Sequence, residues 1–178
     1  MNFKPHDLLV GYQNLLKNLD RTVPVLDLAC GNGCNGLMLA RLGIPVVFAD
    51  KSGSALETVQ QQLKQEALPG RVWQVDLESP NTKPLSDLNF SAIIVFRYLH
   101  RPLFPALLNA VIPGGLVIYE TFTTENRQFG RPVNPDFLLL PGELETIFRG
   151  WDIIFYFEGI RSNPEQAISQ IVARKPAE

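Results

Sequence analysis

The sequence predicts an α/β domain built on a doubly wound, seven-stranded sheet, and three observations support this fold class. Short apolar runs alternate with segments in which apolar residues recur at helical spacing. A glycine-rich stretch, "ACGNGCNG" at residues 29–36, directly follows the first buried run. The last two runs are separated only by residues 160–166, and so short a linker favours an antiparallel pair over a parallel crossover.

The individual elements follow from local patterns. Residues 6–20 predict a helix, because their apolar residues recur three and four positions apart and Pro5 stands where a helix can begin. The last run alternates as a half-exposed edge strand or a hairpin partner would. Strands are expected at 23–29, 44–50, 71–77, 89–99, 114–122, 151–159 and 167–175, and further helices at 35–43, 54–68, 101–112 and 142–150.

The composition limits the classes of protein to which this chain can belong. Hydrophobic residues make up 46% and charged residues 19% of the 178 residues, which predicts one globular domain. The net charge of -2 and the pI of about 5.7 disfavour a nucleic-acid partner. No apolar run approaches the ~20 residues that span a bilayer, and the N-terminus is too polar for a signal peptide, so we expect a cytoplasmic protein without a membrane partner. The two cysteines are too few for a disulfide framework or a structural zinc site, and no metal is expected.

Acidic residues stand at or near the ends of the first three predicted strands. These residues are Asp27, Asp50 and Asp76. Ligands of doubly wound sheets bind at the carboxyl ends of the strands. The three acids therefore predict a polar rim around one elongated ligand.

The glycine stretch contains Gly31, Gly33 and Gly36 in the G-x-G-x-x-G spacing of dinucleotide sites. Asp50 lies nineteen residues after Gly31, where an acid meets ribose hydroxyls. Asp27 is less suited to a dinucleotide, because a carboxylate repels a nearby pyrophosphate. It suits a ligand that carries an ammonium or a sulfonium, and Gly36 then serves only to ease helix packing.

The stretch "VLDLACGNG" resembles the first motif of class I S-adenosylmethionine-dependent methyltransferases, with Ala29 in place of the first glycine. "FAD" ending in Asp50, "VDL" containing Asp76, and "IPGGLVIYET" resemble later motifs of that family. The resemblance extends from about residue 20 to 175. It implies S-adenosylmethionine as cofactor and a sheet order of 3-2-1-4-5-7-6 with strand seven antiparallel. The cofactor-binding residues that it implies are Asp27, Ala29, Cys30, Gly31, Gly33, Asp50, Lys51, Asp76, Leu77 and Arg97.

The segment from "FRYLHRPLF" through "FGRPVNPDFLL" is also similar to small bacterial methyltransferases of the tellurite-resistance type. We therefore expect residues 1–178 to form a single class I methyltransferase domain. Residues 1–20 would carry the N-terminal helix as a candidate lid. Residues 121–141 are expected to form an acceptor loop, since a loop of about twenty residues in a compact domain is usually functional or disordered and this one is rich in phenylalanine.

No catalytic triad is evident, and methyl transfer does not require one, because alignment of donor and acceptor supplies most of the catalysis. The catalytic residues stay unknown, with Tyr98, His100 and Arg101 as candidates. Tyr98 could instead pack against the cofactor, and His100 could cap the following helix. Arg97 and Arg101 could bind an anionic acceptor or be surface charges.

The function indicated is methyl transfer by in-line displacement to a small molecule, such as a thiol, a metalloid oxyanion or a small carboxylate. Two alternatives stay open: an NAD(P)-linked oxidoreductase that uses the same glycine pattern, and a methyltransferase-fold subunit that acts on RNA or protein with a partner. The sequence does not predict an oligomeric state.

Overall fold

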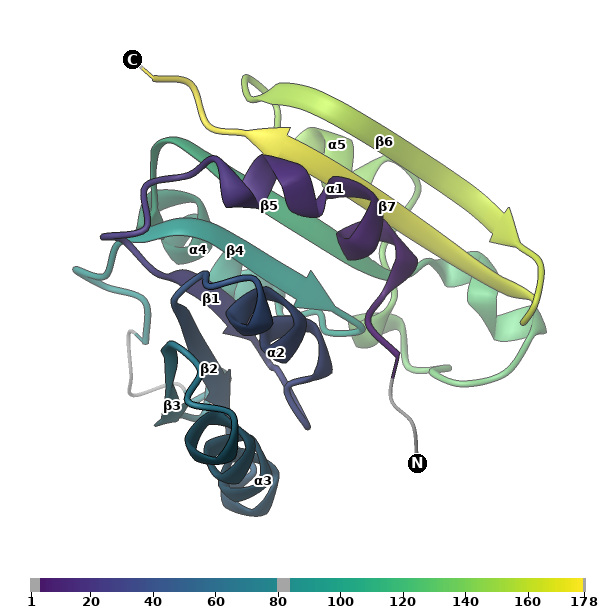
Figure 1. Cartoon of the computed structure of the whole chain (residues 1–178). Helices are drawn as coiled ribbons and strands as arrows, with labels where there is room; N and C mark the ends of the chain where they lie inside the picture. Colours follow the sequence, from purple (N-terminus) through teal and green to yellow (C-terminus); the bar gives the residue numbers. More distant parts are fainter. Residues whose placement is uncertain (1–3, 80–83, 178) are drawn as a thin grey trace.

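The chain folds around a seven-stranded sheet in the order β3-β2-β1-β4-β5-β7-β6 (Figure 1). The computed structural model describes residues 4–79 and 84–177. The strands are β1 (Val25–Leu28), β2 (Val46–Asp50), β3 (Gly70–Gln74), β4 (Phe90–Phe96), β5 (Val111–Phe122), β6 (Asp152–Arg161) and β7 (Gln166–Arg174). The helices are α1 (Asp7–Lys17), α2 (Cys34–Arg41), α3 (Gly53–Gln65), α4 (Phe104–Ala110) and α5 (Glu143–Ile147), with short 3-10 turns η1 (Arg101–Leu103), η2 (Thr124–Gln128) and η3 (Pro135–Phe137).

The sheet is parallel from β3 through β5, and β7 then runs antiparallel to both β5 and β6. The predicted fold class and strand order are therefore confirmed. Helices α2, α3 and α4 connect β1 to β2, β2 to β3 and β4 to β5, and with α1 and α5 they cover both faces of the sheet, as a parallel sheet requires. The residues between β6 and β7 are too few for a crossover, so the chain turns back as a hairpin.

Two hydrophobic layers hold the helices on the sheet. One face packs against α1, α2 and α3, through Leu9, Leu37 and Val59 among others. The other face packs against α4 and α5, through Phe104 and Leu144. Alternate residues of each strand serve opposite layers, as the pleat dictates.

The register of the parallel strands brings their carboxyl ends together at one edge of the sheet. Leu28 at the end of β1 pairs with Ala49 of β2 and with Val95 of β4. Asp50 at the end of β2 pairs with Gln74 of β3. The residues that follow β1 through β4 therefore share one edge of the sheet, where a ligand of such a fold binds.

The structure differs from the sequence prediction in several places: β4 ends at Phe96 instead of Leu99, and β5 begins at Val111 instead of Gly114. Strand β3 ends at Gln74, so Asp76 lies in the loop after the strand. The predicted helix 101–112 is split into η1 and α4, because Pro102 and Pro105 remove backbone donors. Strand β7 is buried along its whole middle instead of half-exposed, because it lies between β5 and β6, and β6 forms the edge.

The loop at 121–141 is packed against the domain and contains η2 and η3. The side chain of Asn126 accepts a hydrogen bond from the Ala167 N–H at 3.0 Å and donates to the Arg131 carbonyl at 3.3 Å. Leu138 and Leu139 are buried in the core. Within the described ranges, no helix combines the length and the apolar character needed to cross a membrane.

Candidate functional site

The turn after β1 is built from residues with left-handed backbone. Ala29, Gly31 and Gly33 have φ values of 54°, 52° and 70°. A left-handed residue with a Cβ costs about 1–2 kcal/mol, which explains why the methyltransferase motif has glycine where this chain has Ala29. A Cβ on Gly31 would meet nothing within 4 Å, so the space above this residue is open for a ligand to approach the backbone.

Asp27 lies beneath this turn, facing α2. Its Oδ2 accepts a hydrogen bond from the Gly36 N–H at 2.8 Å, and the residue is 2% exposed. Burial raises the pKa of Asp27 to about 7, against the lowering effect of the Gly36 hydrogen bond, and the charge of Asp50 adds to the increase. A Cβ on Gly36 would lie 2.7 Å from this carboxylate and would also collide with Phe48. Gly36 therefore makes room for the acid that anchors the first turn of α2.

A cleft of about 200 Å³ opens at the carboxyl edge of the sheet. Of the predicted cofactor residues, Ala29, Asp50, Lys51, Asp76 and Leu77 line it, together with Val75, Glu78 and Tyr98. Asp27, Cys30, Gly31, Gly33 and Arg97 are predicted cofactor residues that do not line this cleft.

Asp50 is the most firmly positioned acid in the cleft. Its Oδ2 accepts from the Gly31 N–H at 2.8 Å, and its Oδ1 accepts from the Ser52 N–H at 2.9 Å. One carboxylate thus ties the glycine turn to the start of α3. Each of its oxygens keeps a lone pair for a hydroxyl donor of a ligand.

Tyr98 forms the wall of the cleft beside β4. Its backbone carbonyl accepts a hydrogen bond from the Tyr119 hydroxyl at 2.7 Å, which fixes the position of the residue. Burial, followed by the nearby carboxylate of Glu78, raises the pKa of the Tyr98 hydroxyl. Tyr98 is therefore a neutral hydroxyl at physiological pH, suited to packing and hydrogen bonding.

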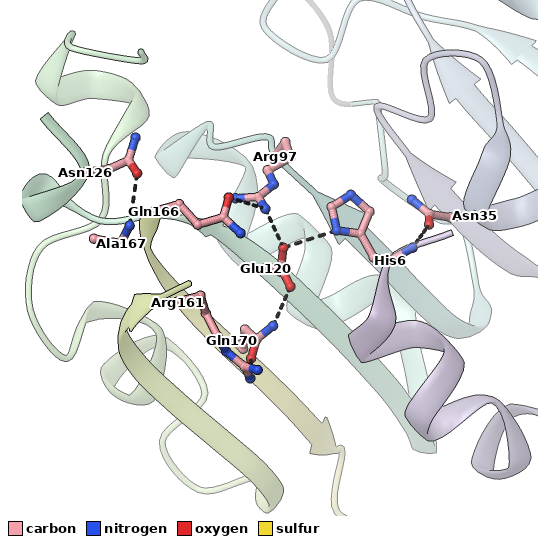
Figure 2. A network of polar contacts seen from close by, with 9 residues as sticks. All are labelled: His6, Asn35, Arg97, Glu120, Asn126, Arg161, Gln166, Ala167 and Gln170. Carbon is pink, nitrogen blue, oxygen red and sulfur yellow. Dashed lines mark hydrogen bonds and ion pairs between the residues drawn. The ribbon is translucent and has the colours of Figure 1, made fainter. Parts of the chain in front are cut away.

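Arg97 and Glu120 form the centre of a polar network beside the cleft (Figure 2). Arg97 has a left-handed φ of 60°, and its guanidinium lies 4.2 Å from the centre of the Phe122 ring. Its Nη2 donates to Gln166 at 2.9 Å and lies 3.0 Å from Oε1 of Glu120. Its Nη1 is buried without a partner among the described residues. Strained backbone of this kind tends to occur at functional sites.

Glu120 is buried in β5 and held from three sides. Its Oε1 also meets Nδ1 of His6 at 3.1 Å, and its Oε2 accepts from the side chain of Gln170, which in turn contacts Arg161. Burial opposes ionisation of Glu120, but the hydrogen bonds from His6 and Gln170 and the charge of Arg97 outweigh it, so its pKa lies below the ordinary value. Glu120 and His6 were not among the predicted site residues, because a contact across 114 positions leaves no local signal.

The other two catalytic candidates have different surroundings. Arg101 donates to both oxygens of Glu143, at 2.6 and 2.8 Å, and to the carbonyls of Asp136 and Leu138. Arg101 therefore braces the loop 121–141 against α5. His100 is half-buried, and its carbonyl accepts from the Leu103 N–H at 3.0 Å at the start of η1.

A larger hollow of about 550 Å³ lies at the opposite end of the sheet, between residues 85–89 and α4. It is remote from the strand ends that carry the acids. Among the residues that the structure describes, no three His, Cys, Asp or Glu side chains gather as metal ligands would.

The chain is similar to tellurite resistance proteins. The family model described as "Tellurite resistance protein TehB" matches residues 13–164. A Haemophilus influenzae relative named "Probable S-adenosyl-L-methionine-dependent methyltransferase TehB" is 25% identical over 141 residues, which cover 76% of this chain and 48% of the relative. "Hemagglutinin 1" of Eikenella corrodens is 26% identical over 164 residues, which cover 88% of this chain and 54% of that protein. The chain thus spans about half the length of these curated relatives.

A comparison of the fold with solved structures points to the same relatives. The crystal structure of TehB from Haemophilus influenzae superposes with a TM-score of 0.77 at 21% identity, covering 96% of this chain and 62% of that one. At this identity the superposition shows a shared fold, that of class I methyltransferases. The family model spans most of the chain, including the glycine turn, the cleft and Glu120. The chain therefore belongs to the TehB family.

Proposed function

We propose that this chain is an S-adenosylmethionine-dependent methyltransferase that acts on a small-molecule acceptor. The observation that carries the proposal is the fixed Asp50 carboxylate at the rim of the cleft, tied to the glycine turn through Gly31. The name of the Haemophilus influenzae relative supports the same activity.

The residues of the cleft fit an adenosine group. Asp50 offers two acceptor oxygens to ribose hydroxyls, as acids after the second strand do in nucleoside sites. Val75 and Leu77 offer apolar surface to a flat base, and Asp76 offers a carboxylate to its amino group. The open space above Gly31 admits the remainder of the cofactor along the backbone. S-adenosylmethionine, when bound, supplies a methyl group on a good leaving group.

Residues at and after the carboxyl ends of β4 and β5 would hold the acceptor. Arg97 and Glu120 present fixed charges there, and Tyr98 joins this region to the cleft. The loop 121–141 leaves the same end of β5, and Arg101 keeps it in place. A fixed loop at this position favours a small molecule such as a thiol, a metalloid oxyanion or a carboxylate over a polymer.

Calorimetry with S-adenosylhomocysteine and with NADH tests the cofactor. We expect binding of the nucleoside thioether and none of NADH. The Asp50→Ala variant should lose about 10- to 100-fold in affinity, since it removes hydrogen bonds to a buried ligand. Asp20→Ala, an exposed acid at the other end of the domain, is the matched control and should bind normally.

Two results would contradict the proposal in different ways. Micromolar binding of NADH without binding of S-adenosylhomocysteine would favour the oxidoreductase alternative. Unchanged affinity in Asp50→Ala would show that this acid does not bind the ribose. A screen of acceptor pools with labelled cofactor then tests the substrate class, and methylation of RNA or protein fractions alone would overturn the small-molecule assignment.

A further inference from the structure

A histidine from the start of the chain is fixed between the glycine turn and the end of β4. The ring of His6 stacks on Phe96, with 4.3 Å between ring centroids. Its backbone N–H donates to Oδ1 of Asn35 in the first turn of α2, at 3.0 Å. Figure 2 shows the ring reaching from the segment before α1 to Glu120. Three separate elements therefore determine the position of His6.

The contact with Glu120 selects one form of the imidazole. An ionised carboxylate only accepts hydrogen bonds, so Nδ1 of His6 must carry a proton and donate it to Oε1 of Glu120. In neutral His6 the lone pair then lies on Nε2. Nε2 has no hydrogen-bond partner among the described residues, and the side chain is 27% exposed, so this nitrogen is accessible.

We propose that His6 is the proton acceptor of the methyl-transfer reaction, with Glu120 as its positioning residue; this inference rests on the proposed function. The acceptor class is then a molecule whose nucleophilic atom still carries a proton at neutral pH, such as an alkyl thiol. That atom forms its bond to the methyl carbon while the carbon–sulfur bond breaks and its electron pair stays on sulfur. His6 takes the released proton on Nε2, and Glu120 stabilises the imidazolium that results.

The charges around His6 suit this role. Glu120 faces it from β5, Arg97 approaches the same carboxylate from the end of β4, and Asp7 follows it in α1, paired with Lys4. Arg161 lies further away, on the other side of Gln170. Glu120 is therefore shared between a permanent cation and a histidine that can gain or lose its proton.

Sinefungin is a probe that requires no knowledge of the acceptor. It carries an amine at the position of the transferred methyl group, whereas S-adenosylhomocysteine has nothing there. If Nε2 of His6 faces that position, it accepts a hydrogen bond from the sinefungin ammonium. We expect His6→Gln and His6→Phe to weaken sinefungin binding about tenfold or more, and to leave S-adenosylhomocysteine binding unchanged.

A pH series separates a titrating base from a merely structural residue. In the wild type, the preference for sinefungin over S-adenosylhomocysteine should be greater at alkaline than at acidic pH, because an imidazolium repels an ammonium. In both variants this pH dependence should disappear. Asn14→Ala, an exposed change in α1, the helix that follows His6, is the control and should behave as the wild type.

These measurements distinguish failure of the assignment of His6 from failure of the proposed function. If the wild type binds neither compound, the proposed function fails. If both compounds lose affinity equally in the His6 variants, His6 contacts the part that they share and the base assignment is wrong. If neither loses affinity, or the pH dependence persists in the variants, His6 does not face the methyl position and the inference is overturned.

Discussion

Replacing Asp27 by asparagine tests the energetics of the acid beneath the glycine turn. Asp27 has a pKa of about 7 in the folded chain, against 3.8 as its ordinary value, chiefly because of burial. The folded state therefore holds this proton more tightly than the unfolded state does. The resulting stabilisation is complete below the ordinary pKa and is lost as the pH rises through 7.

The magnitude follows from the two pKa values. One pKa unit corresponds to about 1.36 kcal/mol, and integrating the two titrations from about pH 5 to about pH 8 gives a loss of about 2.5 kcal/mol in the wild type. Asparagine has the same shape and does not titrate. At about pH 5 the native carboxyl is mostly neutral but the unfolded one is already ionised, so Asp27→Asn should be more stable than the wild type there by about 1.5 kcal/mol. Between about pH 5 and about pH 8 this advantage of the variant should grow by a further ~2.5 kcal/mol, to about 4 kcal/mol.

Urea unfolding at the two pH values measures this difference directly. Asp20→Asn is the control: hydrogen bonds from the Thr22 backbone and hydroxyl lower the pKa of Asp20, so its removal should give a small change of opposite sign. A stability difference between Asp27→Asn and the wild type that stays constant with pH would refute the reasoning. So would a difference that favours the wild type more strongly at the higher pH.

Further substitutions test the turn and the loop. Gly36→Ala should destabilise the domain by about 1–3 kcal/mol through overpacking, whereas Gly11→Ala, at a helix position with open space, should stabilise it by up to about 1 kcal/mol; equal urea midpoints would contradict this. Ala29→Gly should raise the unfolding free energy by about 1 kcal/mol, because it relieves a left-handed backbone, and a loss of stability would show that the strain is absent. Arg101→Gln should make the loop 121–141 sensitive to limited proteolysis while the sheet stays resistant, and unchanged cleavage would mean that Arg101 does not brace the loop.

Much of the fold could be predicted from local patterns. The existence and order of the strands follow from apolar runs, although β3, β4 and β5 begin or end a few residues away from the predicted bounds. The position of Asp50 at the end of β2 follows from its distance along the chain from Gly31, which one helix–strand unit sets. The side of the sheet on which a polar group lies was harder to predict. Asp27 faces α2 instead of the cleft, since the pleat directs it toward the layer that contains Val25 and Phe48.

The polar network around Arg97 and Glu120 could be predicted only in part. Arg97 could be proposed from its position after a buried strand, but its partners Glu120 and Gln166 come from β5 and β7. Gln170 and His6 complete the same network from opposite ends of the chain. Such a network depends on tertiary packing, and no spacing within one segment encodes it.

The position of β7 between β5 and β6 has a consequence for how the domain assembles. The edge of β5 stays unpaired until the last strand inserts, although β6 precedes that strand in sequence. During synthesis the glycine turn and the strands around it can pair early, while His6 must wait for β5 and the network must wait for β7. We therefore expect nucleoside binding to appear before acceptor-side chemistry as the chain emerges. Loss of residues from β7 should harm folding far more than a similar loss from an exposed loop.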